Sequence, residues 1–72
     1  MTEFNICVNN QDYEASLELW KVYRAIKDNR AKKQGLLRVI DESGEDYLFP
    51  SDYFIPVSLP KTVQDAMMQG SL

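Results

Sequence analysis

The clearest pattern of apolar and polar positions lies in the stretch from Gly35 to Val57, GLLRVIDESGEDYLFPSDYFIPV. An apolar run, Leu36 to Ile40, is followed by a polar segment containing Gly44, and then by a second apolar and aromatic run, Tyr47 to Phe49. Short runs of β-favouring residues on either side of a glycine-containing turn are typical of a β-hairpin. The sequence therefore predicts two antiparallel strands here, and Pro50, which lacks a backbone donor, ends the second.

The N-terminal residues alternate between apolar and polar or small side chains. Phe4, Ile6 and Val8 are each separated by one such residue, and this period of two predicts a strand with one face on a core. The next residues, 9–12 (NNQD), favour a turn because Asn and Asp tolerate left-handed backbone and bond to it locally. We therefore expect a first hairpin whose second arm begins near Tyr13.

The stretch from residue 16 to residue 26 is unusually apolar, and its period is ambiguous. Apolar residues at i, i+3, i+4 and i+7 from Leu19 fit the stripe of an amphipathic helix, but the segment also fits a strand with both faces partly covered. Trp, Val, Tyr and Ile are strand formers, and a change of face near Leu19 and Trp20 is what a bulge or bend produces. We favour the strand for residues 16–26 and keep the helix as the alternative.

The segment from Asp28 to Gly35 carries start and stop signals for a short helix. Asp28 can cap the first free N–H groups, residues 31–34 (AKKQ) are good helix formers, and Gly35 can close the turn in a left-handed conformation. The sequence therefore predicts a helical turn near 28–34.

The C-terminal third contains three further local signals. Ser51 and Asp52, directly after the proline, predict a single 3₁₀ turn with a side-chain cap. Residues 55–59 then predict a last short strand, and residues 62–68 a small helix that is marginal on its own. Residues 70–72 are expected to fray.

Two resemblances rest on these residues. The segment YLFPSDYFIPV resembles the C-terminal end of SH3 domains, where a strand passes through a 3₁₀ turn into the final strand, and Pro50 and Tyr53 are the matched positions. The segments YEASLELWKVYRAI and GLLRVIDESGEDYLFP, within Cys7 to Pro60, resemble a family of small uncharacterised bacterial proteins, and this likeness implies no activity. The chain departs from SH3 domains after Tyr23, because too little chain remains for their long arginine-and-threonine-type loop and their mid-chain tryptophan has no counterpart. The SH3 likeness therefore implies barrel topology and not proline-rich peptide binding.

The predicted fold is mostly β, a small SH3-like barrel of about five strands. We expect one small β domain over residues 1–60, followed over residues 61–72 by a short helix or a frayed tail. A chain of 72 residues is long enough for one domain with a small core.

The charge distribution adds to this picture. The net charge of −3 counts against general nucleic-acid binding, because affinity for phosphate comes largely from Lys and Arg. The charge is uneven, however, since residues 21–38 hold seven basic residues and one acid, whereas residues 41–52 hold five acids and no base. The simplest interpretation is solvated faces that partly neutralise one another, and the alternative is a polarised surface that steers a charged partner.

The N-terminus and the cysteine content bear on the compartment. The chain as given has an acid at position 3, no basic and apolar leader pattern, and no apolar run long enough to span a membrane. One cysteine, Cys7, cannot form an internal disulfide. We expect a cytoplasmic protein with no membrane segment, in which Cys7 is a buried, inert side chain, with a reactive thiol as the alternative.

The chain lacks the residues that most catalytic mechanisms require. The chain has no histidine and one cysteine, so it has no Cys/His metal cluster and no Ser-His or Cys-His pair. Its three glycines form no phosphate-binding loop, and the acidic turn at 41–46 does not match the ligand spacing of an EF-hand. We expect no enzyme activity, no cofactor and no metal.

The leading functional hypothesis is a non-catalytic protein-interaction module with an unknown protein partner. Aromatic residues beside the acidic turn would form the surface, since Tyr and Trp dominate interface energetics. The candidate partner-binding residues are Glu45, Asp46, Tyr47, Phe49, Pro50 and Tyr53.

Two alternatives remain open. The first is a small-barrel nucleic-acid-binding protein that uses the basic segment 21–38, with salt-sensitive binding. The second is a self-associating structural protein, a monomer or weak homodimer that pairs through strand edges. The candidate nucleic-acid residues are Arg24, Lys27, Arg30, Lys32 and Lys33.

Overall fold

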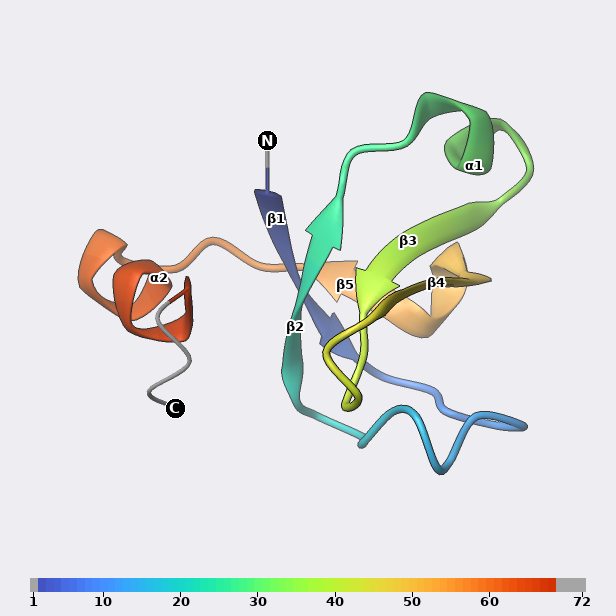
Figure 1. Ribbon diagram of the computed structural model, residues 1–72, viewed down its shortest axis with the longest axis horizontal. Helices are drawn as coiled ribbons and strands as arrows, with labels where there is room; N and C mark the ends of the chain where they lie inside the picture. Colours follow the sequence, from blue (N-terminus) through green and yellow to red (C-terminus); the bar gives the residue numbers. More distant parts are fainter. Residues whose placement is uncertain (1, 69–72) are drawn as a thin grey trace.

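The computed structural model describes residues 2–68 of the chain, so the expected fraying at 70–72 lies outside the described residues. Over these residues the protein is mostly strand, with two short helices and one 3₁₀ turn (Figure 1). None of the helices within the described residues is long and apolar enough to cross a membrane. The elements are β1 (Thr2–Cys7), β2 (Val22–Ile26), α1 (Asn29–Lys33), β3 (Leu36–Ile40), β4 (Asp46–Pro50), η1 (Ser51–Tyr53), β5 (Phe54–Pro56) and α2 (Lys61–Met68).

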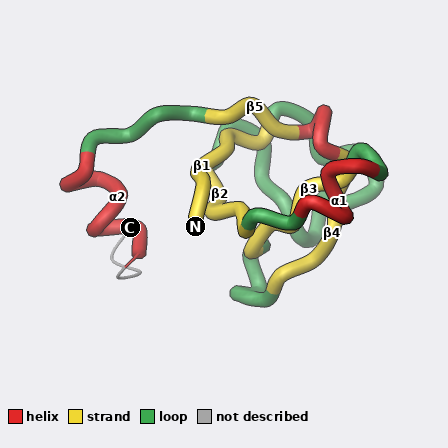
Figure 2. The backbone as a smooth tube through the Cα atoms, turned by 90° about the horizontal axis from the view of Figure 1, so that it is seen from above, coloured by secondary structure: helices red, strands yellow, loops and turns green. Residues whose placement is uncertain are grey.

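The five strands form one antiparallel sheet in the order β4-β3-β2-β1-β5. The sheet is curled into a half-barrel, and the last strand returns to pair with the first (Figure 2). This arrangement confirms the mostly-β prediction and is compatible with the small SH3-like barrel expected from the sequence.

The elements with local signals form where the sequence predicts them. The β3–β4 hairpin pairs Ile40 with Asp46 and turns through Gly44 at φ +84°. The helical turn begins at its predicted cap, where Asp28 Oδ1 accepts the N–H of Ala31 at 3.0 Å. The 3₁₀ turn and the C-terminal helix are also present, although η1 has no side-chain cap and the last strand is only three residues long.

The core lies on the concave face of the sheet. Leu17 and Val39 are completely buried there, and Phe49 and Phe54 are nearly so. All five strands and the β1–β2 connection contribute residues to this core, which fits a domain too small for a layered core. The core residues are Cys7, Leu17, Tyr23, Ala25, Val39, Phe49 and Phe54.

The structure shows which face of the first strand lies on the core. Asn5 pairs with Tyr23 and, like Cys7, lies on the core face, so the alternating Phe4 lies on the opposite face of β1. Phe4 is nevertheless only 7% exposed, and it lines a hollow together with Leu59, from the segment before α2, and Gln64, from α2. Because Phe4 is buried although it does not face the core, the alternation of apolar and polar residues alone does not indicate which face of β1 packs on the core.

The predicted strand over residues 16–26 is correct only for its second half. Residues 8–21 form a long connection between β1 and β2, and neither the strand nor the helix alternative describes Tyr13 to Trp20. The carbonyl of Tyr13 accepts the N–H groups of Ser16 and Leu17, which makes one tight turn, and the chain bends at Trp20.

Trp20 combines two unusual features. Its φ of +66° lies in the left-handed region, and its side chain is 68% exposed. A bulky residue pays a steric cost there that glycine avoids. We expect Trp20→Gly to be more stable than Trp20→Ala by about 1 kcal/mol, the reverse of their usual order.

Urea denaturation of the two Trp20 variants, followed by circular dichroism, measures this difference. An alanine variant as stable as the glycine variant would show that the backbone at this position relaxes out of the left-handed region.

Candidate functional site

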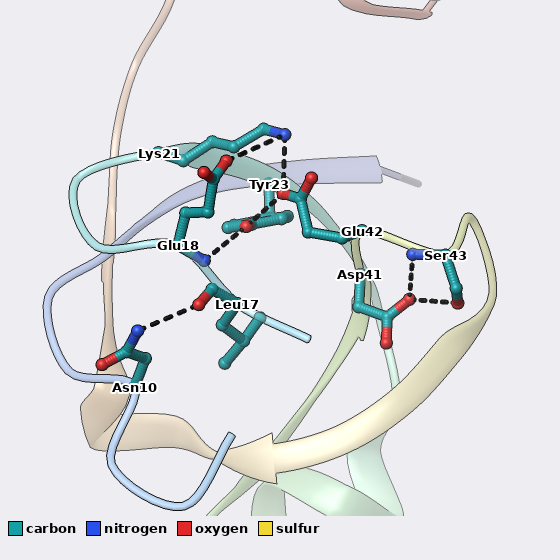
Figure 3. A network of polar contacts seen from close by, with 8 residues as sticks. All are labelled: Asn10, Leu17, Glu18, Lys21, Tyr23, Asp41, Glu42 and Ser43. Atoms are coloured by element: carbon teal, nitrogen blue, oxygen red, sulfur yellow. Dashed lines mark hydrogen bonds and ion pairs between the residues drawn. The ribbon is translucent and has the colours of Figure 1, made fainter. Parts of the chain in front are cut away.

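A polar network ties the β1–β2 connection to the β3–β4 turn (Figure 3). Glu42 donates its backbone N–H to the carbonyl of Ser16 at 3.2 Å. The buried hydroxyl of Tyr23 donates to a carboxylate oxygen of Glu42 and accepts the N–H of Glu18 at 2.8 Å. Lys21 Nζ lies 2.6 Å from the same oxygen of Glu42. These contacts fix the position of the connection against the hairpin.

A hollow of about 400 Å³ lies between the connection and the hairpin. One side comes from residues 13–16 of the connection, and the other from the β3–β4 turn and β4. We call it the aromatic–acidic hollow. It is lined by Tyr13, Ser16, Asp41, Ser43, Glu45, Tyr47, Leu48 and Phe49.

Aromatic rings form the wall of the hollow. Tyr13 packs edge-to-face on the buried Phe49, with ring centroids 5.1 Å apart at an interplanar angle of 86°. Tyr13 also meets Tyr53 at 6.1 Å and 73°, and the Tyr53 hydroxyl donates to the carbonyl of Gln11 at 3.1 Å. Edge-to-face pairs of this kind add to the stabilisation from burial. Tyr13 is thereby held in place although it lies in a loop.

Two carboxylates give the hollow its charge. Asp41 is only 8% exposed, and its Oδ1 accepts both the N–H and the hydroxyl of Ser43. Glu45 accepts the hydroxyl of Tyr47 at 2.8 Å, and this bond, together with the charge of Glu45, raises the pKa of Tyr47. Among the described residues that line the hollow, none is basic. The hollow is therefore negatively charged and rich in hydroxyl groups.

Only some of the predicted partner-binding residues line the hollow. Glu45, Tyr47 and Phe49 line the hollow, although Phe49 is a buried wall residue and not an exposed contact. Asp46 forms an ion pair with Arg38 instead, at 3.0 Å. Pro50 and Tyr53 are half-buried and are not part of the lining, although Tyr53 reaches the wall through its contact with Tyr13.

Sequence reasoning missed Tyr13 and Ser16. Their position depends on the fold of the connection, and no local pattern marks them. The DYEAS segment that contains them has turn-forming residues, which was the one available hint.

The basic residues lie elsewhere. Lys27, just before α1, and Arg30, Lys32 and Lys33 on α1 are exposed at the end of β3 that is remote from the acidic turn (Figure 1). Arg24 is half-buried on β2. The structure thus brings four of the five candidate nucleic-acid residues to one end of the molecule, and the nucleic-acid alternative stays a prediction, as does self-association.

Cys7 belongs to the core. It is completely buried, and its Sγ donates to the carbonyl of Asn9 at 3.3 Å. Burial raises the pKa of the thiol, which keeps it protonated. This environment is typical of an inert structural cysteine.

The aromatic–acidic hollow is thus a surface of rings, hydroxyls and carboxylates held between two parts of the chain. Between residues 2 and 68, no group of three or more carboxylate, thiol or imidazole side chains is placed to hold a metal ion. Comparison of the chain with protein-family models, with curated proteins and with solved structures found no match in any of the three.

Proposed function

We propose that the protein is a non-catalytic interaction module that docks a protein partner at the aromatic–acidic hollow. The observation that carries the proposal is the exposure of Tyr47 and Leu48, at 50% and 38%, beside a wall whose Phe49 is 3% exposed. Large aromatic and apolar side chains next to a preformed depression are typical of interface anchors.

The scaffold supports this role. Tyr47 and Leu48 lie on β4, an edge strand paired to β3 along its whole length. The opposite wall, at Tyr13, is held by ring contacts and by the Ser16–Glu42 backbone bond. A surface that is already ordered loses little conformational entropy when a partner binds.

The chemistry of the hollow favours binding over catalysis. The chain has no histidine, and its one thiol is buried in the core. The carboxylate of Glu45 is exposed and accepts a hydrogen bond from a tyrosine hydroxyl, whereas a carboxyl group that acts as a general acid typically lies in an apolar pocket.

Site-specific photocrosslinking in the cells that naturally produce the protein tests the proposal. Benzoylphenylalanine replaces Tyr47 in one variant and Trp20 in a matched control, because both are exposed aromatic residues but only Tyr47 lines the hollow. We expect a discrete protein adduct from position 47, identified by mass spectrometry, and none from position 20.

Two outcomes contradict the proposal. If position 47 gives no adduct, the hollow is not a docking site under these conditions. If both positions give the same adducts in equal yield, exposure alone explains the crosslink.

A further inference from the structure

We infer that the aromatic–acidic hollow receives an arginine side chain of its protein partner. The inference rests on the proposed function and goes one step beyond it, because it names the chemical group that fills the hollow. Three features of the lining carry it: a carboxylate with one oxygen free to accept a hydrogen bond, the absence of a base, and the side chains of two tyrosines.

The carboxylate of Asp41 can accept further hydrogen bonds. Asp41 is 8% exposed, and both of its hydrogen bonds to Ser43 end on Oδ1 (Figure 3). A carboxylate has about four acceptor sites on its two oxygens. Within the described part of the chain, Oδ2 has no hydrogen-bond partner, and the residue lines the hollow. No buried side-chain oxygen among the described residues lacks a partner, so Oδ2 is open to solvent, and a donor placed in the hollow can bond to it.

Lys21 and Arg38 are engaged with acids that do not line the hollow. Lys21 pairs with Glu42 and Glu18, and Arg38 pairs with Asp28 and Asp46. No ion pair among the described residues involves Asp41 or Glu45. The negative charge of the lining is thus left for a ligand, and charge complementarity selects a cationic one.

The aromatic lining selects arginine among the cations. A guanidinium group is planar, stacks on aromatic faces and donates in a rigid fork that fits a carboxylate, whereas an ammonium group is a strongly hydrated point charge. Tyr13 and Tyr47 supply ring surface on two sides, and Asp41 and Glu45 supply acceptors. The hydroxyls of the two lining serines offer further acceptors for the outer N–H groups.

An NMR titration of the isotope-labelled protein tests the inference. The probes are three acetylated and amidated pentapeptides with one central residue between two glycine pairs: arginine, lysine, or citrulline, which has the shape of arginine without its charge. We expect saturable shifts at the amides of residues 13–16 and 41–48, with arginine binding tightest and citrulline weakest by about fivefold or more.

Two variants with the same charge change separate the hollow from general attraction. Asp41→Asn keeps an acceptor for Ser43 and removes the charge, and we expect it to weaken arginine binding about fivefold. Asp65→Asn removes a charge from α2, away from the hollow, and should leave the affinity unchanged. Glu45→Gln provides a second test if Asp41→Asn disturbs the turn.

The outcomes distinguish this inference from the proposed function. Equal affinity for arginine and citrulline, shifts centred on another surface, or equal weakening by the two Asp→Asn variants would each overturn it. If crosslinking at position 47 succeeds and the titration fails, the hollow docks a partner without an arginine. If both fail, the proposed function falls as well.

Discussion

Leu17→Ala is expected to lower the free energy of unfolding by about 2–5 kcal/mol. Leu17 is completely buried and is the one residue of the β1–β2 connection that belongs to the core cluster. The truncation removes its buried methyl groups and leaves a cavity beneath the connection, because the surrounding core relaxes only partly. Because native domains are stable by only about 5–15 kcal/mol, this loss is a large part of the total.

Leu19→Ala is the matched control. Leu19 is the same residue type two positions along the chain, but it is 46% exposed, so its truncation should change stability by no more than about 0.5 kcal/mol. Urea denaturation followed by circular dichroism measures both variants. Similar losses at the two positions would show that the connection does not pack on the core as described.

The contrast between these leucines shows where sequence reasoning stops. The alternating strand expected over residues 16–26 places Leu17 and Leu19 on the same face, yet one is buried and the other is exposed. The hairpin, the Asp28 cap and the turn after Pro50 were predicted because each depends on residues a few positions apart. The path of the connection depends on contacts with the hairpin far along the chain, which no local period encodes.

The same limit applies to the candidate site. Glu45, Tyr47 and Phe49 were predicted because they flank one hairpin turn. The facing wall came from the structure, because Tyr13 and Ser16 reach the hollow only through long-range contacts. The acidic charge of the site was visible in the sequence, but the absence of a base from the lining was not, since that depends on where Lys21 and Arg38 form their ion pairs.

Tyr23→Phe is expected to lower the free energy of unfolding by about 1–3 kcal/mol, because it leaves the N–H of Glu18 without its partner and removes one of the two donors to the Glu42 carboxylate oxygen. The Tyr23 hydroxyl accepts the N–H of Glu18 and donates to the carboxylate of Glu42, and the side chain is 4% exposed. Tyr47→Phe is the control, since that hydroxyl also donates to a carboxylate but belongs to a residue that is 50% exposed. It should cost no more than about 0.5 kcal/mol, and an equal loss in both variants would contradict a buried role for the network.

The pH dependence of Tyr23→Phe provides a second signature. Burial raises the pKa of Tyr23, and its hydrogen bond to Glu42 raises it further. An unfolded tyrosine loses its proton near pH 10, so the stabilisation is complete below that pH and is lost as the pH rises above it. Urea denaturation between pH 8 and about 11 should therefore show a steeper decline for the wild type than for Tyr23→Phe. Lys21, whose pKa the Glu42 carboxylate also raises, contributes to the decline in both proteins, so equal slopes would mean that Tyr23 is as free to ionise in the folded chain as in the unfolded one.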